Sequence, residues 1–103
     1  MKVRTGTVGM TPNYLADRLG GFVQHTGGGC AAIEFQLPAG GWVWVTPQCD
    51  SFEWSARDTA INSEELSAGF MVGFYKEDGD FLGAVYSPDI EAVDALMKVL
   101  ALR

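Results

Sequence analysis

A turn between two apolar segments constrains the fold of this chain more than any other feature. Residues 30–37, CAAIEFQL, alternate with a period of two, which is the pattern of a strand with one buried face. The turn PAGG and the segment WVWVT at 42–46 follow, so the two segments predict a β-hairpin. Successive strand residues point to opposite faces, so Trp42 and Trp44 share one face and the valines that follow them share the other.

The length of the turn determines which of these two faces is buried. A three-residue loop places Pro38 at the second turn position and Gly40 in the left-handed conformation, and it pairs Leu37 with Gly41. In this register the valines join the isoleucine, phenylalanine and leucine of the first strand. Both tryptophans then lie on the other face of the sheet.

A four-residue loop over 38–41 is the competing register. It would place both tryptophans in the core and set Cys30 opposite Cys49. We favour the three-residue loop. We also expect both cysteines to be thiols, because disulfides are rare in a reducing cytosol.

A second hairpin is indicated by residues 70–86, FMVGFYKEDGDFLGAVY, in which Asp78 and Gly79 supply the turn. The expected pairs are Tyr75 with Phe81, Phe74 with Leu82, and Gly73 with Gly83. Both faces of this hairpin are apolar. We therefore expect it to lie centrally in the sheet and to be covered on both sides.

Helices are predicted near both ends of the sequence. In TPNYLADRLGG at 11–21, Thr11 is a suitable N-cap and Gly20 a suitable C-terminal residue. SPDIEAVDALMKVLALR at 87–103 predicts a longer helix that Ser87 caps. The apolar stripes of the two helices consist of Tyr14, Leu15 and Leu19, and of Ile90, Val93, Leu96, Met97 and Leu100.

These elements predict an α+β fold with an antiparallel sheet of about four strands from two β-hairpins. The short N-terminal helix and the longer C-terminal helix are expected to pack on one face of this sheet. Residues 11–103 are predicted to form a single domain, and residues 1–10 a flexible arm or an edge strand. A chain of 103 residues, 48% of them hydrophobic, is long enough to bury one core.

The charge balance argues against several classes of partner. The formal net charge is −6, from 13 acidic and 7 basic residues. Nucleic acids and anionic membrane surfaces attract basic proteins, so we expect neither as a partner. No apolar run is long enough to span a membrane, and the first ten residues lack the apolar core of a signal peptide. We expect a cytoplasmic protein whose partner, if charged, is basic.

The loop HTGGGC at 25–30 holds the residues that are most suited to catalysis. His25 could activate the thiol of Cys30, and the glycine amides could hold an oxyanion. The plain alternative is a flexible turn that leads into the first strand, and we favour it because no third orienting group is evident. The cysteine and histidine spacing matches no zinc motif. We therefore predict no metal site and no cofactor.

Over residues 15–83 the chain resembles small orphan proteins of actinobacterial, mycobacterial-type phages. The resemblance is carried by LADRLGGFVQHTGGGCAAIEFQLPAGGWVWVT, with its glycine-rich loop and hairpin, and by VGFYKEDGDFLG. It implies a non-enzymatic protein that binds a host protein in the host cell cytoplasm. It assigns no particular binding residues.

The leading functional hypothesis is therefore a non-enzymatic protein-binding module directed at a host protein. Tryptophan is enriched at binding hot spots, and the favoured register turns two tryptophans away from the core. The predicted protein-binding residues are Trp42, Trp44, Phe52 and Trp54. One alternative is a structural homodimer formed through the sheet face, with the 70–86 hairpin at its centre. Another is a small ligand binder or thiol enzyme that uses His25 and Cys30.

Overall fold

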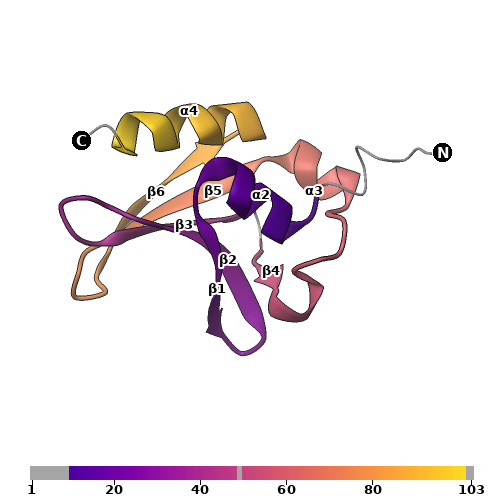
Figure 1. Ribbon diagram of the computed structural model, residues 1–103, viewed down its shortest axis with the longest axis horizontal. Coiled ribbons are helices and arrows are strands. Elements are labelled where there is room, and N and C mark those ends of the chain that lie inside the picture. Colours follow the sequence, from indigo (N-terminus) through magenta and orange to yellow (C-terminus); the bar gives the residue numbers. More distant parts are fainter. Residues whose placement is uncertain (1–9, 49, 102–103) are drawn as a thin grey trace.

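The computed structural model describes residues 10–48 and 50–101 and has an α+β fold built on an antiparallel sheet (Figure 1). The elements follow in the order α2 (Pro12–Leu19), β1 (Phe22–Gly27), β2 (Cys30–Gln36), β3 (Trp42–Pro47), β4 (Phe52–Glu53), the 3-10 helix η1 (Trp54–Ala56), α3 (Ser63–Ala68), β5 (Phe70–Tyr75), β6 (Phe81–Ser87) and α4 (Ile90–Ala101). The prediction for residues 1–10 falls outside the described residues except at Met10, whose carbonyl accepts a 2.8 Å hydrogen bond from the amide of Ile61.

The sheet has six strands in the described residues, so the expected number of about four is wrong. Its main order is β1-β2-β3-β5-β6, and β4 pairs with the beginning of β2. The two strands beyond the predicted hairpins are β1 and β4. The second half of β1 falls in the loop predicted at 25–30. A two-residue turn of Gly28 and Gly29 instead returns the chain directly, so β1 and β2 form a hairpin of their own.

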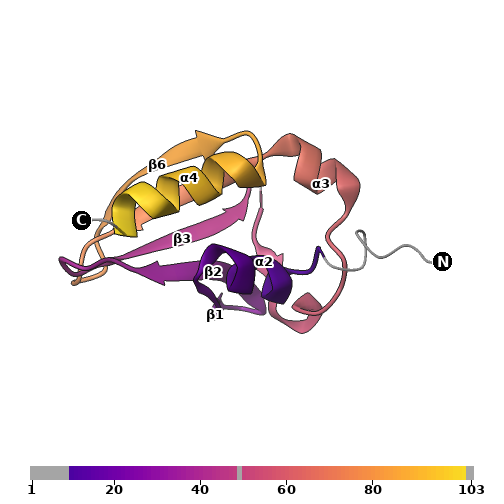
Figure 2. The same ribbon diagram turned by 45° about the horizontal axis from the view of Figure 1, so that its top comes forward.

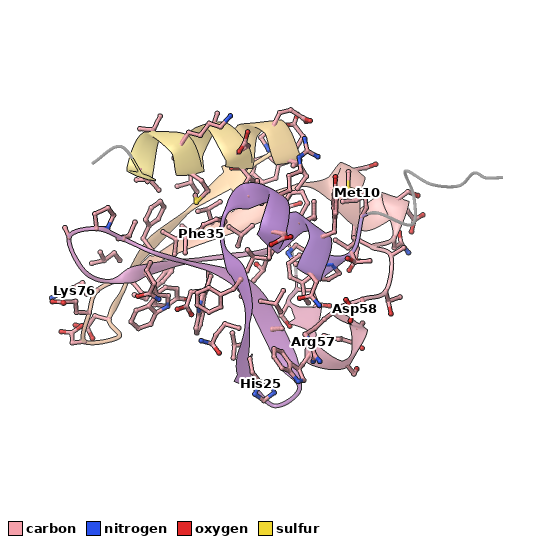
Figure 3. All side chains as sticks on the ribbon, viewed as in Figure 1. Met10, His25, Phe35, Arg57, Asp58 and Lys76 are labelled. Carbon is pink, nitrogen blue, oxygen red and sulfur yellow. The ribbon has the colours of Figure 1, made fainter. Side chains whose placement is uncertain are left out.

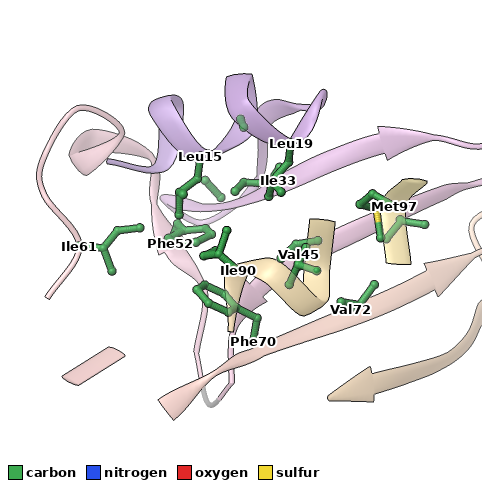
Figure 4. Close-up of a cluster of buried hydrophobic side chains, with 14 residues drawn as sticks. Leu15, Leu19, Ile33, Val45, Phe52, Ile61, Phe70, Val72, Ile90 and Met97 are labelled. Atoms are coloured by element: carbon green, nitrogen blue, oxygen red, sulfur yellow. The ribbon is translucent and has the colours of Figure 1, made fainter. Parts of the chain in front are cut away.

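Side chains from α2 and α4 contribute to the same buried cluster as the central strands. Figures 1 and 2 show α2 against β1 and β2 and α4 along β5 and β6, both on one side of the sheet. Figure 4 shows Leu15 and Ile90 from the two helices in one cluster with Ile33 and Val45 from the strands. The cluster comprises Leu15, Ala16, Leu19, Ala31, Ile33, Val43, Val45, Phe52, Ile61, Phe70, Val72, Ile90, Val93 and Met97.

The β2–β3 hairpin, which carries Trp42 and Trp44, has the favoured register. Ile33 lies opposite Val45 and Phe35 opposite Val43, and the amide of Leu37 donates a 3.1 Å hydrogen bond to the carbonyl of Gly41. Both valines are fully buried. The competing register, which would bury the tryptophans in this core, is therefore wrong.

Cys30, at the beginning of β2, has strand neighbours on both sides. Cys30 lies opposite Gly27 of β1 and Glu53 of β4, and it is a free thiol. Cys49 lies outside the described residues.

The second hairpin, β5–β6, begins as predicted and then shifts by one residue. Tyr75 lies opposite Phe81, but a bulge follows, so that Phe74 pairs with Gly83 and Gly73 pairs with Ala84. Gly83 has a φ of +145°, a conformation that L side chains rarely adopt and that suits a bulge. The predicted pairing of two glycines is wrong. The central placement is also wrong, because β6 lies at the edge of the sheet and much of it is exposed.

The helix boundaries follow the predicted capping for α2 and differ for α4. The side chain of Thr11 accepts a 3.0 Å hydrogen bond from the amide of Tyr14, and Gly20 ends α2 in the left-handed conformation. The Tyr14 side chain is 47% exposed, so the buried stripe uses Ala16 instead. Ser87 is the last residue of β6 and does not cap α4. Instead, a carboxylate oxygen of Asp89 accepts a 2.9 Å hydrogen bond from the backbone amide of Ala92.

Candidate functional site: an aromatic face of the sheet

The sheet surface opposite α2 and α4 carries four neighbouring aromatic side chains. Trp42 and Trp44 of β3 alternate with the buried valines and are partly buried. Trp42 lies opposite Tyr75 of β5, and Tyr75 lies opposite Phe81 of β6, so that these side chains share one face. We call Trp42, Trp44, Tyr75 and Phe81 the aromatic face.

The rings of the aromatic face form a continuous packed layer. The rings of Trp42 and Tyr75 are stacked, with centroids 5.5 Å apart and planes 8° apart. The centroid of Tyr75 also lies 4.9 Å from that of Trp44 and 5.4 Å from that of Phe81. Tyr75 therefore contacts all three other rings and is the centre of the layer.

A glycine in β5 provides the space that this layer needs. Gly73 lies opposite Trp44, and a Cβ atom at Gly73 would meet ring atoms of Tyr75 at 3.4 Å and of Phe81 at 3.6 Å. The two rings thus lie over the glycine, against the sheet. The layer remains open to solvent at its border, where Phe81 is 60% exposed.

A buried carboxylate holds Trp44 in place. Glu34 lies opposite Trp44 and is only 7% exposed. Its Oε1 accepts a 2.7 Å hydrogen bond from the indole Nε1 of Trp44, and its Oε2 accepts one from the side-chain Nε2 of Gln36. Within the described residues no ion pair to Glu34 is found. The carboxylate is therefore stabilised by these donors, and Trp44 has a fixed orientation.

The second tryptophan has no such acceptor. The indole Nε1 of Trp42 is buried and, within the described residues, lacks a hydrogen-bond partner. A Cβ atom at Gly79 would lie 4.0 Å from the Trp42 ring, so the β5–β6 turn lies beside it. Trp42 is thus held by stacking on Tyr75 and by packing near the turn.

The turn beside Trp42 is acidic. Glu77, Asp78 and Asp80 lie there and are exposed, while Lys76 forms a 3.8 Å ion pair with Asp78. Glu77 also approaches the neighbouring β2–β3 loop, because a Cβ atom at Gly40 would come within 2.6 Å of its side chain. Negative charge is therefore concentrated at one border of the aromatic face.

The structure does not bring Phe52 and Trp54 to this face. Phe52 is 5% exposed and belongs to the hydrophobic core under α2 and α4. Trp54 is partly buried and packs against the same core. The guanidinium carbon of Arg57 lies 3.8 Å from the centroid of the Trp54 ring, and the ring of His25 meets Trp54 edge-on at 5.3 Å. The contact between His25 and Trp54 holds η1 against the β1–β2 hairpin.

The residues that sequence reasoning missed are Tyr75 and Phe81. Both lie in the predicted apolar hairpin, and the sequence did not indicate which strand lies beside that hairpin in the sheet. Only the pairing of β3 with β5 places Tyr75 beside Trp42. The shared face of Tyr75 and Phe81 was detectable, because their pairing across the hairpin was predicted correctly.

His25 and Cys30 are not arranged as a nucleophile and its base. His25 lies opposite Ala31, whose side chain is in the core, whereas Cys30 precedes Ala31 and points to the other face. In Figure 3, His25 lies with Arg57 at the free end of the β1–β2 hairpin, away from Lys76. The described residues contain no group of three or more histidine, cysteine, aspartate or glutamate side chains that could hold a metal ion.

None of the described helices is both long enough and apolar enough to cross a membrane. No protein-family model, curated protein or solved structure matches the chain.

Proposed function

We propose that this protein is a non-enzymatic protein-binding module whose contact surface is the aromatic face. The observation that supports the proposal is the layer of Trp42, Trp44, Tyr75 and Phe81 on the side of the sheet opposite α2 and α4. A contiguous apolar surface of this kind is typical of protein interfaces.

The aromatic face has the rigidity expected of a binding surface. Tyrosine and tryptophan dominate binding hot spots because their rings provide large contact areas with few rotatable bonds. The hydrogen bond from Trp44 to Glu34 and the stacking of Trp42 on Tyr75 restrict these rings before a partner arrives. Such preorganisation reduces the entropy lost on binding.

The partner that fits this surface is basic. The chain carries a net charge of −6, and Glu77, Asp78 and Asp80 border the aromatic face near Trp42. Lysine and arginine side chains of a partner would meet these carboxylates and could also lie over the indole rings. The resemblance to small actinobacterial phage proteins suggests that the basic surface belongs to a host protein.

Binding to one purified protein tests the proposal. Affinity capture from an actinobacterial lysate supplies candidates, and each candidate is then purified and titrated with this protein. We expect Trp42→Leu/Tyr75→Leu to weaken the complex at least about tenfold, which corresponds to about 1.4 kcal/mol. This variant keeps the hydrogen bond between Trp44 and Glu34 intact.

Tyr14→Leu is the matched control for that titration, because Tyr14 is exposed on α2, on the opposite side of the sheet. We expect it to bind as tightly as the wild type. Equal affinity of the wild type and the aromatic-face variant, with both folded by circular dichroism, would contradict the proposal. So would tighter binding at high ionic strength, since attraction between opposite charges is screened by salt.

A further inference from the structure

Strand β6 forms an open edge of the sheet. Within the described residues it pairs only with β5, and Figure 2 shows it along the border of the sheet with no described segment outside it. Every second residue of an edge strand directs its amide and carbonyl away from the sheet. Its sequence, FLGAVYS, contains neither a charged residue nor a proline.

The exposed apolar side chains of the molecule are concentrated on this strand. Seven large hydrophobic side chains are exposed in the described part of the chain, and four of them lie on β6. They are Phe81 at 60%, Leu82 at 64%, Val85 at 46% and Tyr86 at 47%. Monomeric proteins protect such edges with lysines, prolines or short strands, and here only the bulge near Leu82 interrupts the edge.

We propose that β6 pairs with β6 of a second copy of this chain, antiparallel and around a two-fold axis. β6 carries no charged residue although the net charge of the chain is −6, so a partner strand of the same uncharged, apolar composition meets it without opposing like charges. A second β6 has this composition. Two-fold antiparallel pairing also satisfies the outward backbone groups of both strands with a single interface.

The proposed pairing has a consequence for the aromatic face. A two-fold axis perpendicular to the sheet keeps corresponding faces on the same side, so the two sheets become one continuous sheet. The aromatic faces of both copies then lie side by side, with Phe81 of each copy close to the new interface. The dimer presents two binding surfaces in one direction, which increases the avidity for a partner with repeated sites. The pairing itself does not depend on the proposed function.

Sedimentation velocity over a concentration series tests the pairing. We expect the wild type to shift from monomer to dimer as concentration rises. A lysine within β6 should prevent this, because a charge would be buried at the interface. Val85→Lys and Leu82→Lys are two independent variants at exposed positions, and each is expected to weaken dimerisation at least about tenfold.

Tyr14→Lys is the matched control, since Tyr14 is as exposed as Tyr86 but lies on α2. It should dimerise like the wild type. Hydrogen exchange provides a second measurement, because the β6 amides that point away from β5 should become protected only at dimer-forming concentrations. A wild type that stays monomeric throughout the series would overturn the proposal.

The aromatic-face variant separates this inference from the proposed function. Trp42→Leu/Tyr75→Leu should leave the dimer unchanged. If that variant dissociates the dimer and both lysine variants do not, the copies associate face to face and pairing through β6 is excluded.

Discussion

The indole Nε1 of Trp44 donates a 2.7 Å hydrogen bond to the carboxylate of Glu34, a side chain that is 7% exposed. The two residues lie directly opposite each other on β2 and β3, on the face of the sheet away from α2 and α4. Burying a carboxylate is unfavourable unless donors compensate it. The indole therefore stabilises the acid, and the acid fixes the ring that the aromatic face presents.

Replacement of Trp44 by phenylalanine should destabilise the fold more than the same replacement of Trp42. Trp44→Phe removes a donor from a buried carboxylate, and such losses cost about 1–3 kcal/mol. Trp42→Phe removes a buried N–H that has no acceptor in the described residues, which offsets its lost ring contacts. Urea unfolding of the two variants measures the difference. Equal unfolding free energies would show that the bond to Glu34 contributes nothing.

Gly41 should tolerate alanine far less well than Gly28. Both have positive φ angles, +82° and +60°, for which alanine carries a penalty of about 1–2 kcal/mol. A Cβ atom at Gly41 would also lie 2.3 Å from the carbonyl oxygen of Tyr75, whereas Gly28 has nothing within 4 Å. We expect Gly28→Ala to show only the conformational penalty and Gly41→Ala to exceed about 3 kcal/mol, because the β3–β5 pairing must shift. Chemical denaturation of both variants tests the contrast.

Asp89→Ala should destabilise the fold by about 1 kcal/mol through loss of the cap of α4. The Asp89 carboxylate accepts the amide of Ala92 at 2.9 Å, and alanine leaves that amide without a side-chain acceptor. Asp89→Asn keeps an acceptor oxygen and is the control, with a smaller expected loss. Thermal unfolding compares the three proteins. If the asparagine and alanine variants lose equal stability, charge rather than capping is responsible.

Salt should affect the two proposed associations in opposite directions. Two copies, each of net charge −6, repel each other, and added salt screens that repulsion and favours the β6 dimer. The same salt should weaken the complex with a basic partner. Sedimentation and titration calorimetry at low and high ionic strength measure the two effects separately. A dimer that weakens with salt would indicate attraction between charged groups instead of pairing of uncharged strands.

Features defined by neighbouring residues could be predicted from the sequence. The β2–β3 register follows from Pro38 and Gly40 in the turn, and the boundaries of α2 follow from Thr11 and Gly20. In the β5–β6 hairpin, the pair next to the turn was also predicted correctly. The one-residue bulge beyond it was not, because nothing in an apolar strand requires the shift before Gly83.

The candidate site could be predicted only in part. Trp42 and Trp44 lie together on the face that the hairpin indicated, while Phe52 and Trp54 pack with the core on the other side. Phe52 and Trp54 are predicted binding residues from the sequence. The pairing of β4 with β2 and the packing of η1 instead direct both rings inward.

The sequence by itself determined the turns of the β2–β3 and β5–β6 hairpins, the α2 caps and the face on which the two tryptophans lie, because short-range sterics and hydrogen bonds decide these features. Only the tertiary structure decided that β5 lies beside β3, which places Tyr75 against Trp42, and that β6 is left at the edge. The order of strands depends on which apolar faces pack together under α2 and α4. Many arrangements satisfy the local pattern equally well, and packing of the whole core selects one of them.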